Sequence, residues 1–187
     1  MPQVTYFSAD LCQYNAIFEK LKKFRNSDEF ELMNSARKKI VENALRDFRL
    51  GGAELPPQEK ERFLKIQEEL SALSSRFNDN LLDATNSFML HVENADELSG
   101  IPDDVLETAR ETAAKDGAPG WKFTLHAPSY LPVMQYSDNR ALREKMYRAS
   151  STRASELSKV EWNNTPLISK ILELREEEAR MLGFDCY

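Results

Sequence analysis

The segment from Pro57 to about Leu90 most constrains the fold, because it contains no glycine and no further proline. Its apolar residues recur at steps of three and four: Phe63, Ile66, Leu70, Leu73, Phe77, Leu81, Ala84 and Phe88. This period places them on one face of an α-helix that is longer than most. A coiled coil is the alternative. The loosely fitting charges and the repeated phenylalanine favour an irregular packed core instead.

Two helices are expected before this segment. The first carries an apolar stripe between Leu11 and Phe24. Ser27 and Asp28 then supply a cap and a first-turn acid for the second. The second helix ends at Gly51-Gly52, since glycine accepts the left-handed conformation found at helix ends. Its apolar face comprises Phe30, Met33, Ala36, Ile40, Ala44, Leu45 and Phe48.

The part of the chain after residue 100 contains more glycine and proline residues, which mark the ends of helices and strands. Gly100–Asp104 opens a short helix, and Asp116–Gly120 reads as a loop. Residues 121–126 alternate apolar and polar side chains as a half-buried strand does, and Val133–Tyr136 is a second extended piece that could pair with it. These pieces predict a β-hairpin-like element near residues 121–136.

Two more helices are expected near the end of the chain. One runs from Asp138 through Arg148, and its successor has Thr165 as N-cap, Pro166 as first residue and Gly183 just beyond its last turn. The predicted fold class is mainly α and multi-helical, with one long helix and one small β element. Residues 1–187 are expected to form a single helical unit.

Charge and hydropathy exclude several classes of protein. The net charge of -6 argues against a nucleic-acid binder, because phosphate contacts need clustered lysine and arginine. The basic cluster Lys20, Lys22, Lys23 and Arg25 is followed by acidic residues and reads as a solvated helix face. No apolar run approaches a membrane span, so no membrane partner is expected.

The ends of the chain bear on its compartment. Met1–Thr5 lacks the charged and apolar regions of a secretory signal. Cys12 and Cys186 give no disulfide framework, and they can be joined only if the two ends meet. A reducing cytoplasm is therefore the expected location.

The histidines do not form a recognisable metal motif. A His-Glu-x-x-His site needs two imidazoles four residues apart on one helical face, but the two histidines are His91 and His126. A metal site that joins them to a cysteine and a carboxylate from distant segments is the less favoured alternative. His91 is expected to cap the long helix, and His126 to lie at a strand end.

Other candidate sites have simpler structural interpretations. No Gly-x-Ser-x-Gly elbow and no glycine-rich phosphate loop is present. Ser150, Ser151 and Ser155 near Arg148 and Arg153 resemble an anion site, but capping of a helix end is preferred. The run Glu176–Glu178, flanked by Arg175 and Arg180, reads as solvated ion pairs rather than as a metal or acid–base site. No catalytic or metal residue is assigned, and substrate-binding residues stay unknown.

Several segments in a shared order carry a family resemblance. They are Ala44–Gly52, Leu55–Lys60, Leu70–Ala84, Pro128–Met134, Asn139–Ala149, Tyr147–Glu156, Trp162–Glu176 and Ala179–Phe184. In order and spacing this sequence resembles the oligopeptidase A and thimet oligopeptidase family of zinc metallopeptidases, with the best match over about residues 44–187.

The resemblance implies the N-terminal part of a longer, mostly helical peptidase. In that family two helical halves enclose a channel that admits short peptides. Its zinc-binding His-Glu-x-x-His helix lies downstream of the region that this chain resembles. No catalytic residue of the family transfers to a position here, and zinc is a cofactor of the full-length family only. A truncated oligopeptidase portion, inactive alone, is the leading hypothesis.

Two alternatives stay open. A non-catalytic helical interaction module, able to self-associate through apolar surface, belongs to a different functional class. A gene remnant without function is the other alternative. Short peptides are the expected partners only if a catalytic half completes the site.

Overall fold

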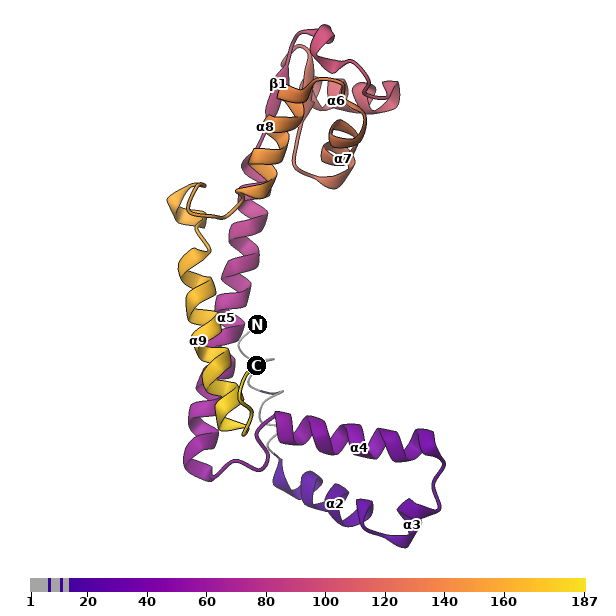
Figure 1. Ribbon diagram of the computed structural model, residues 1–187, viewed down its shortest axis with the longest axis vertical. Coiled ribbons are helices and arrows are strands. Elements are labelled where there is room, and N and C mark those ends of the chain that lie inside the picture. The colour runs from indigo at the N-terminus through magenta and orange to yellow at the C-terminus, as the bar shows by residue number, and fades with distance from the viewer. Residues whose placement is uncertain (1–6, 8–10, 12–13) are drawn as a thin grey trace. The chain divides into compact units, whose positions relative to one another are not determined.

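The computed structural model describes residues 7, 11 and 14–187 (Figure 1). The prediction of a mainly α fold is confirmed. The described helices are α2 Asn15–Arg25, α3 Asp28–Glu31, α4 Ser35–Leu50, α5 Pro57–Ser87, α6 Asp103–Lys115, α7 Ala127–Tyr136, α8 Arg140–Ser151 and α9 Thr165–Met181. Two short 3-10 helices, η1 Ala95–Leu98 and η2 Val160–Trp162, and two strands, β1 Leu90–Val92 and β2 Trp121–Phe123, complete the described elements.

Contacts divide the chain into two compact units. Unit 1 comprises residues 1–75 and 167–187, and unit 2 comprises residues 76–166. This division is based on contacts between residues and does not test whether the chain folds as one unit. The single helical unit expected over residues 1–187 therefore stays a prediction. No helix among the described residues is long and apolar enough to cross a membrane.

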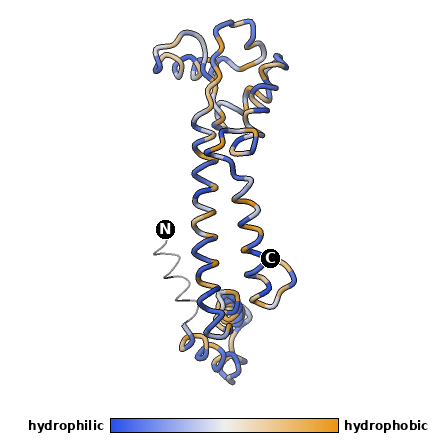
Figure 2. Tube along the Cα trace, turned by 90° about the vertical axis from the view of Figure 1, so that its left-hand side faces the viewer, coloured by the Kyte–Doolittle hydropathy of each residue, from blue (hydrophilic) through white to orange (hydrophobic). Residues whose placement is uncertain are grey.

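The long helix is present, but it ends at Ser87, and the last residues of the predicted range, 88–90, lie outside it. α5 spans 31 residues, and hydrophobic and hydrophilic residues alternate along its turns (Figure 2). Phe63 and Ile66 on its apolar stripe are buried. Near its end the Ser87 hydroxyl donates to the Ala84 carbonyl, and strand β1 begins three residues beyond the helix at Leu90.

The single helix expected between residues 28 and 50 is wrong, because the chain forms two. Ser27 does act as the predicted N-cap, accepting from the Phe30 amide at 3.3 Å, but α3 ends at Glu31. The side chain of Asn34 then accepts from the Arg37 amide at 2.9 Å and starts α4. This second cap interrupts the helix. Ile40, which was expected on the apolar face, is exposed.

The predicted stop at Gly51-Gly52 is confirmed. Gly52 has a φ of +84°, which side chains with a Cβ rarely adopt. Its amide donates to the Arg49 carbonyl, and the next amide, of Ala53, donates to the Phe48 carbonyl. This pair of bonds satisfies the open carbonyls at the end of α4.

A compact cluster joins α2, α3 and α4 in unit 1. Its buried members are Phe18, Phe30, Val41, Leu45 and Ala53. The rings of Phe18 and Phe48 lie 5.7 Å apart between centroids, a typical distance for packed aromatic side chains. The whole cluster comes from residues 18–53, so its contacts are local in sequence.

The β element of unit 2 was half predicted. The expected strand over residues 121–126 is present only at Trp121–Phe123. Its antiparallel partner is Leu90–Val92, with Leu90 opposite Phe123 and Val92 opposite Trp121. The expected second piece at 133–136 is wrong, since these residues lie in helix α7, which has Pro128 in its first turn. Proline fits the first turn of a helix without loss of a hydrogen bond.

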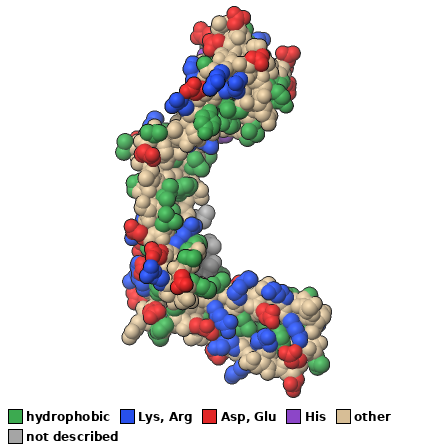
Figure 3. All heavy atoms as spheres, in the orientation of Figure 1, with side chains coloured by type: hydrophobic (Ala, Val, Ile, Leu, Met, Phe, Trp, Pro, Cys, Tyr) green, Lys and Arg blue, Asp and Glu red, His purple; other side chains and the backbone are tan. Residues whose placement is uncertain are grey.

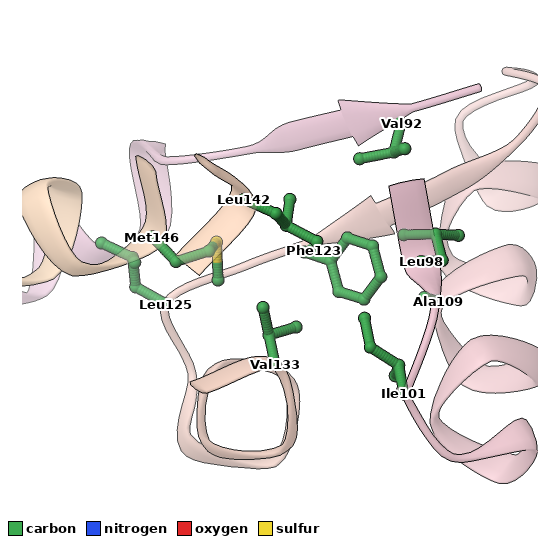
Figure 4. Packing of buried hydrophobic residues seen from close by; sticks show 9 residues of the cluster. All are labelled: Val92, Leu98, Ile101, Ala109, Phe123, Leu125, Val133, Leu142 and Met146. Atoms are coloured by element: carbon green, nitrogen blue, oxygen red, sulfur yellow. The ribbon is translucent and has the colours of Figure 1, made fainter. Parts of the chain in front are cut away.

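Unit 2 has a larger core built around this sheet (Figure 4). The ring of Phe123 is fully buried and lies between side chains from the helices and the loop before α6. The buried members are Val92, Leu98, Ile101, Ala109, Phe123, Leu125, Val133, Leu142 and Met146.

Candidate functional site

Neither histidine lies where the sequence placed it. His91 does not cap α5 but sits in β1 opposite Lys122, and its Nε2 contacts the Pro119 carbonyl. His126 is the N-cap residue of α7, three residues beyond the end of β2. Within the part of the chain that the structure describes, no three His, Cys, Asp or Glu side chains are grouped to hold a metal. These residues therefore do not fit a zinc site.

The serine and arginine cluster near residue 150 is engaged with the backbone. The Ser151 hydroxyl donates to the Tyr147 carbonyl at 2.8 Å, and the Ser155 hydroxyl donates to the Thr152 carbonyl at 2.8 Å. Arg153 donates to the Ser150 carbonyl and to the Thr85 hydroxyl. The bonds to the Tyr147 and Ser150 carbonyls lie at the end of α8, as the capping interpretation predicted, while the bond to Thr85 joins Arg153 to α5.

A buried amide pair fixes the connection before α9. Asn80 on α5 donates to the side-chain oxygen of Asn164 at 2.8 Å, and Asn164 donates to the Phe77 carbonyl at 3.0 Å. The Asn164 amide also donates to the carbonyl of Ala154, which has a φ of +50°. Because the two asparagines are 84 residues apart, no local pattern in the sequence signals this pair.

The three consecutive glutamates of α9 have different surroundings. Glu176 pairs with Arg180 at 2.5 Å on the surface, as predicted. Glu177 pairs instead with Arg62 of α5 through two hydrogen bonds of 2.6 and 2.5 Å. The hydrogen bonds from Arg62 hold the pKa of the Glu177 carboxyl below its ordinary value.

Glu178 is the exception among the three. Its Oε1 accepts from the neutral side-chain amide of Gln67 at 2.6 Å. Burial raises the pKa of the Glu178 carboxyl, against the opposing effects of the Gln67 hydrogen bond and of Arg175. The sequence interpretation of a solvated pair is therefore wrong for Glu178.

Two cavities of unit 1 adjoin the end of α9. One of about 420 Å³ is lined by Leu50, Glu178, Ala179, Leu182, Phe184, Cys186 and Tyr187. The other, of about 550 Å³, shares Leu50, Leu182 and Phe184 with it and is also lined by Arg46, Arg49, Glu54 and Glu59. The first cavity contains one acidic side chain among apolar and aromatic ones, while the second carries charged side chains of both signs.

Unit 2 contains a polar cavity of about 380 Å³ between α6, β2 and the start of α7. Thr108 and Thr112 on its wall donate their hydroxyl protons to the helix backbone. Lys122, also on the wall, pairs with Asp116. Because these three side chains already have partners within the protein, none of them is left to bind a ligand in the cavity.

The basic cluster of α2 is a solvated face, as predicted. Figure 3 shows lysine and arginine side chains mixed with acidic ones over α2–α4. Lys22 lies within ion-pair distance of Glu19 and Glu54, and Arg25 of Glu31 and Glu42. Cys186 is a free, exposed thiol. Cys12 lies outside the described residues, so the question of whether the two cysteines meet stays open.

Comparison with known proteins places the sequence in a family. Residues 1–61 match the model described as the neurolysin/thimet oligopeptidase N-terminal domain, and residues 133–187 match peptidase family M3. The first match extends the resemblance beyond the segment 44–187 to the start of the chain.

Similar proteins align over the whole chain. It is 42% identical to oligopeptidase A of Haemophilus influenzae and 40% identical to oligopeptidase A of Escherichia coli, in each case over all of this chain and 28% of the relative. It is 39% identical to the probable cytosolic oligopeptidase A of Arabidopsis thaliana, over 27% of that protein. The chain thus spans little more than a quarter of the length of these relatives.

Proposed function

The chain belongs to peptidase family M3, in the N-terminal region of oligopeptidase A-like sequences, and from this premise we propose that it is a non-catalytic helical portion of a peptide-hydrolysing enzyme. The observation that carries the proposal is the alignment of its whole length with 28% of oligopeptidase A. The same chain lacks a His-Glu-x-x-His motif.

The chemistry of hydrolysis would then come from the remainder of the enzyme. In a zinc peptidase the metal and a glutamate activate the attacking water. The described residues offer no grouped ligands for such a metal, so the metal, zinc in our proposal, would be held elsewhere. This portion would shape the protein around short peptide substrates and would have no hydrolytic activity alone.

The proposed location is the cytoplasm. One plant relative is named as cytosolic, and the described helices include none that could cross a membrane. A nucleic-acid partner is not expected, given the net charge of -6.

A direct test measures hydrolysis of a quenched fluorescent peptide by the purified chain in the presence of zinc. We expect no turnover, whereas full-length oligopeptidase A of Escherichia coli should cleave the peptide under the same conditions. Chelator-sensitive turnover by the chain would contradict the proposal.

A chimera tests the positive half of the proposal. The matching region of the Escherichia coli enzyme is replaced by this chain, and peptide hydrolysis is measured. We expect the chimera to keep activity, because the exchanged regions are 40% identical over the entire chain. A matched chimera that carries Phe123→Ala should lose activity, because the substitution removes a fully buried ring and destabilises the fold of the exchanged region. A well-folded chimera without hydrolysis would refute a role as an interchangeable part of the enzyme.

An interaction module is the second candidate, and a specific observation favours it. Several large apolar side chains are exposed, Leu32 at 88%, Leu157 at 75% and Val160 at 90% among them. Association surfaces are marked by contiguous patches of such side chains, and Leu157 and Val160, only three residues apart in unit 2, are the candidates for one. Size-exclusion chromatography with light scattering distinguishes the two: a stable dimer supports self-association, and a monomer over a wide concentration range argues against it.

A further inference from the structure

The 420 Å³ cavity at the end of α9 combines an apolar wall with one acid. Leu50, Ala179, Leu182 and Phe184 form much of the wall, and Glu178 is its carboxylate. Phe184, one of the wall residues, is half exposed to solvent. A carboxylate beside aromatic and aliphatic side chains is a common setting for binding an organic cation.

The charge of Glu178 lacks a close partner. Glu176 and Glu177 on the same helix each have an arginine at 2.5 Å. For Glu178 the structure shows a hydrogen bond from neutral Gln67 and no lysine or arginine within ion-pair distance among the described residues. Arg175 acts on it only from farther away, and its guanidinium lies over the ring of Tyr187 at 4.7 Å.

Burial makes this unpaired charge costly. Desolvation raises the pKa of the Glu178 carboxyl, so its ionised form is less favourable here than in water. A cation that enters the cavity would compensate the carboxylate for the hydration that it loses on burial.

The geometry favours an ammonium group over a guanidinium. Gln67 already occupies one oxygen of Glu178, Oε1. An arginine fork needs both oxygens for its paired hydrogen bonds, whereas an ammonium acts as a point charge with one acceptor. The apolar wall suits a methylene stem, which lysine has and a peptide N-terminal amine lacks.

We infer that this cavity binds the lysine side chain of a peptide, with the ammonium at the Glu178 carboxylate and the stem against Leu50 and Leu182. Binding here involves no bond cleavage and is independent of the proposed place in a peptidase. The partner's chemistry is therefore one basic side chain on an extended or flexible segment.

The test uses the purified chain and blocked amino acids, followed by NMR chemical shifts. Nα-acetyl-lysine amide should give saturable shifts at the amides of Ala179 and Leu182. Nα-acetyl-norleucine amide keeps the stem without the charge and should not saturate. Nα-acetyl-arginine amide and norleucine amide, which carries only an α-ammonium, should both bind more weakly than the lysine probe.

Two variants make the test specific. Glu178→Gln should weaken binding of the lysine probe about tenfold or more, the loss of one charge-assisted hydrogen bond. Glu176→Gln, on the same helix but on a surface ion pair, should leave binding unchanged. Both variants should keep the helical circular dichroism spectrum.

Several results would overturn the inference. Absence of saturable shifts with the lysine probe in the unaltered chain would do so, as would equal affinity in Glu178→Gln. Equal binding of the norleucine probe would show an apolar pocket without cation recognition. None of these measurements involves hydrolysis, so their failure is distinguishable from failure of the peptidase proposal.

Discussion

The two hydrophobic clusters of the molecule are built in different ways. In unit 2 the core around Phe123 joins residues from position 92 to position 146, including both strands and three helices. In unit 1 the cluster of α2–α4 uses only residues 18–53. Long side chains cover this smaller cluster, with Arg25 4.2 Å and Lys38 5.4 Å from the ring centre of Phe30.

The difference teaches where each unit should be vulnerable. A core closed by strands and helices from distant segments cannot rearrange easily around a lost side chain. A cluster covered by lysine and arginine can let their methylene stems move into the gap. We therefore expect unit 2 to respond most to changes in packing and unit 1 to depend more on charge.

The largest effect should come from Phe123→Ala. Phe123 is fully buried, and the cavity left by its ring should destabilise unit 2 by about 3 to 5 kcal/mol. Phe30→Ala removes an equally buried ring from unit 1 and should fall at the lower end of that range, because Arg25 and Lys38 can cover the gap. Urea unfolding, with hydrogen exchange read separately over residues 90–150 and 15–53, measures both.

An equal loss of unfolding free energy in Phe30→Ala and Phe123→Ala would contradict the proposed difference between the two units. Phe184→Ala is the control, since its ring is half exposed and should change stability by less than about 0.5 kcal/mol.

The sequence predicted those features that depend on local patterns. The three- and four-residue spacing that begins at Phe63 located α5, although it continues to Phe88, one residue beyond the helix end. Gly52 marked the end of α4. The cap at Asn34 is hidden from apolar periodicity, because the apolar spacing continues through Met33 and Ala36 on either side of it. Residues 133–136 were assigned to a strand although Pro128 fits the first turn of a helix.

Features that depend on tertiary contacts could not be predicted in this way. The partner of β2 lies some thirty residues earlier in the chain, beyond the reach of hairpin signals. Gln67 and Glu178 are 111 residues apart, and only the packing of α5 with α9 brings them together. The same packing places Glu177 beside Arg62 and buries Glu178 beside neutral Gln67, so the pKa values of the two carboxyls shift in opposite directions. The sequence shows only consecutive glutamates and gives no sign of this difference.

The next largest effect should come from a glycine beside the sheet. A Cβ at Gly120 would lie 2.3 Å from the Val92 carbonyl oxygen, and its φ of +81° already disfavours a side chain. Gly120→Ala should therefore cost about 2 to 4 kcal/mol, from backbone strain and forced movement of β1.

Gly117→Ala is the matched control in the same loop. Its φ is +71°, but no atom lies within 4 Å of a Cβ placed there. This variant should show only the strain of about 1 to 2 kcal/mol. Equal unfolding midpoints for the two variants would mean that the approach to Val92 does not restrict the fold.

A smaller effect should follow removal of the buried amides in unit 2. Asn164→Ala removes the acceptor for Asn80 and the donor to Phe77, and should cost about 1 to 3 kcal/mol. Asn80→Ala removes one of these bonds and should cost less. A double-mutant cycle measured by urea unfolding should give a coupling between the two, because they share a hydrogen bond. Additive effects would contradict that pairing.

The smallest effect should be a pH dependence of opposite sign at two neighbouring glutamates of unit 1. The pKa of Glu177 is lowered in the folded chain by hydrogen bonds from Arg62, so its stabilisation is present above the unfolded value of 4.5 and is lost as pH falls through the folded value. The pKa of Glu178 is raised by burial, so its ionisation destabilises the fold as pH rises from 4.5 through its folded value.

Two isosteric variants separate these contributions. At neutral pH Glu177→Gln should lower the unfolding midpoint and Glu178→Gln should raise it, while below the folded pKa of Glu177 both should approach the unaltered chain. High salt should shrink the Glu177 effect, because both side chains of its pair with Arg62 are partly exposed. Thermal unfolding between pH 3 and pH 8 measures this, roughly the range in which paired and buried carboxyls titrate. A loss of stability on Glu178→Gln at neutral pH would show that the carboxylate already has a compensating charge within the chain, and would remove the reason for a cation in its cavity.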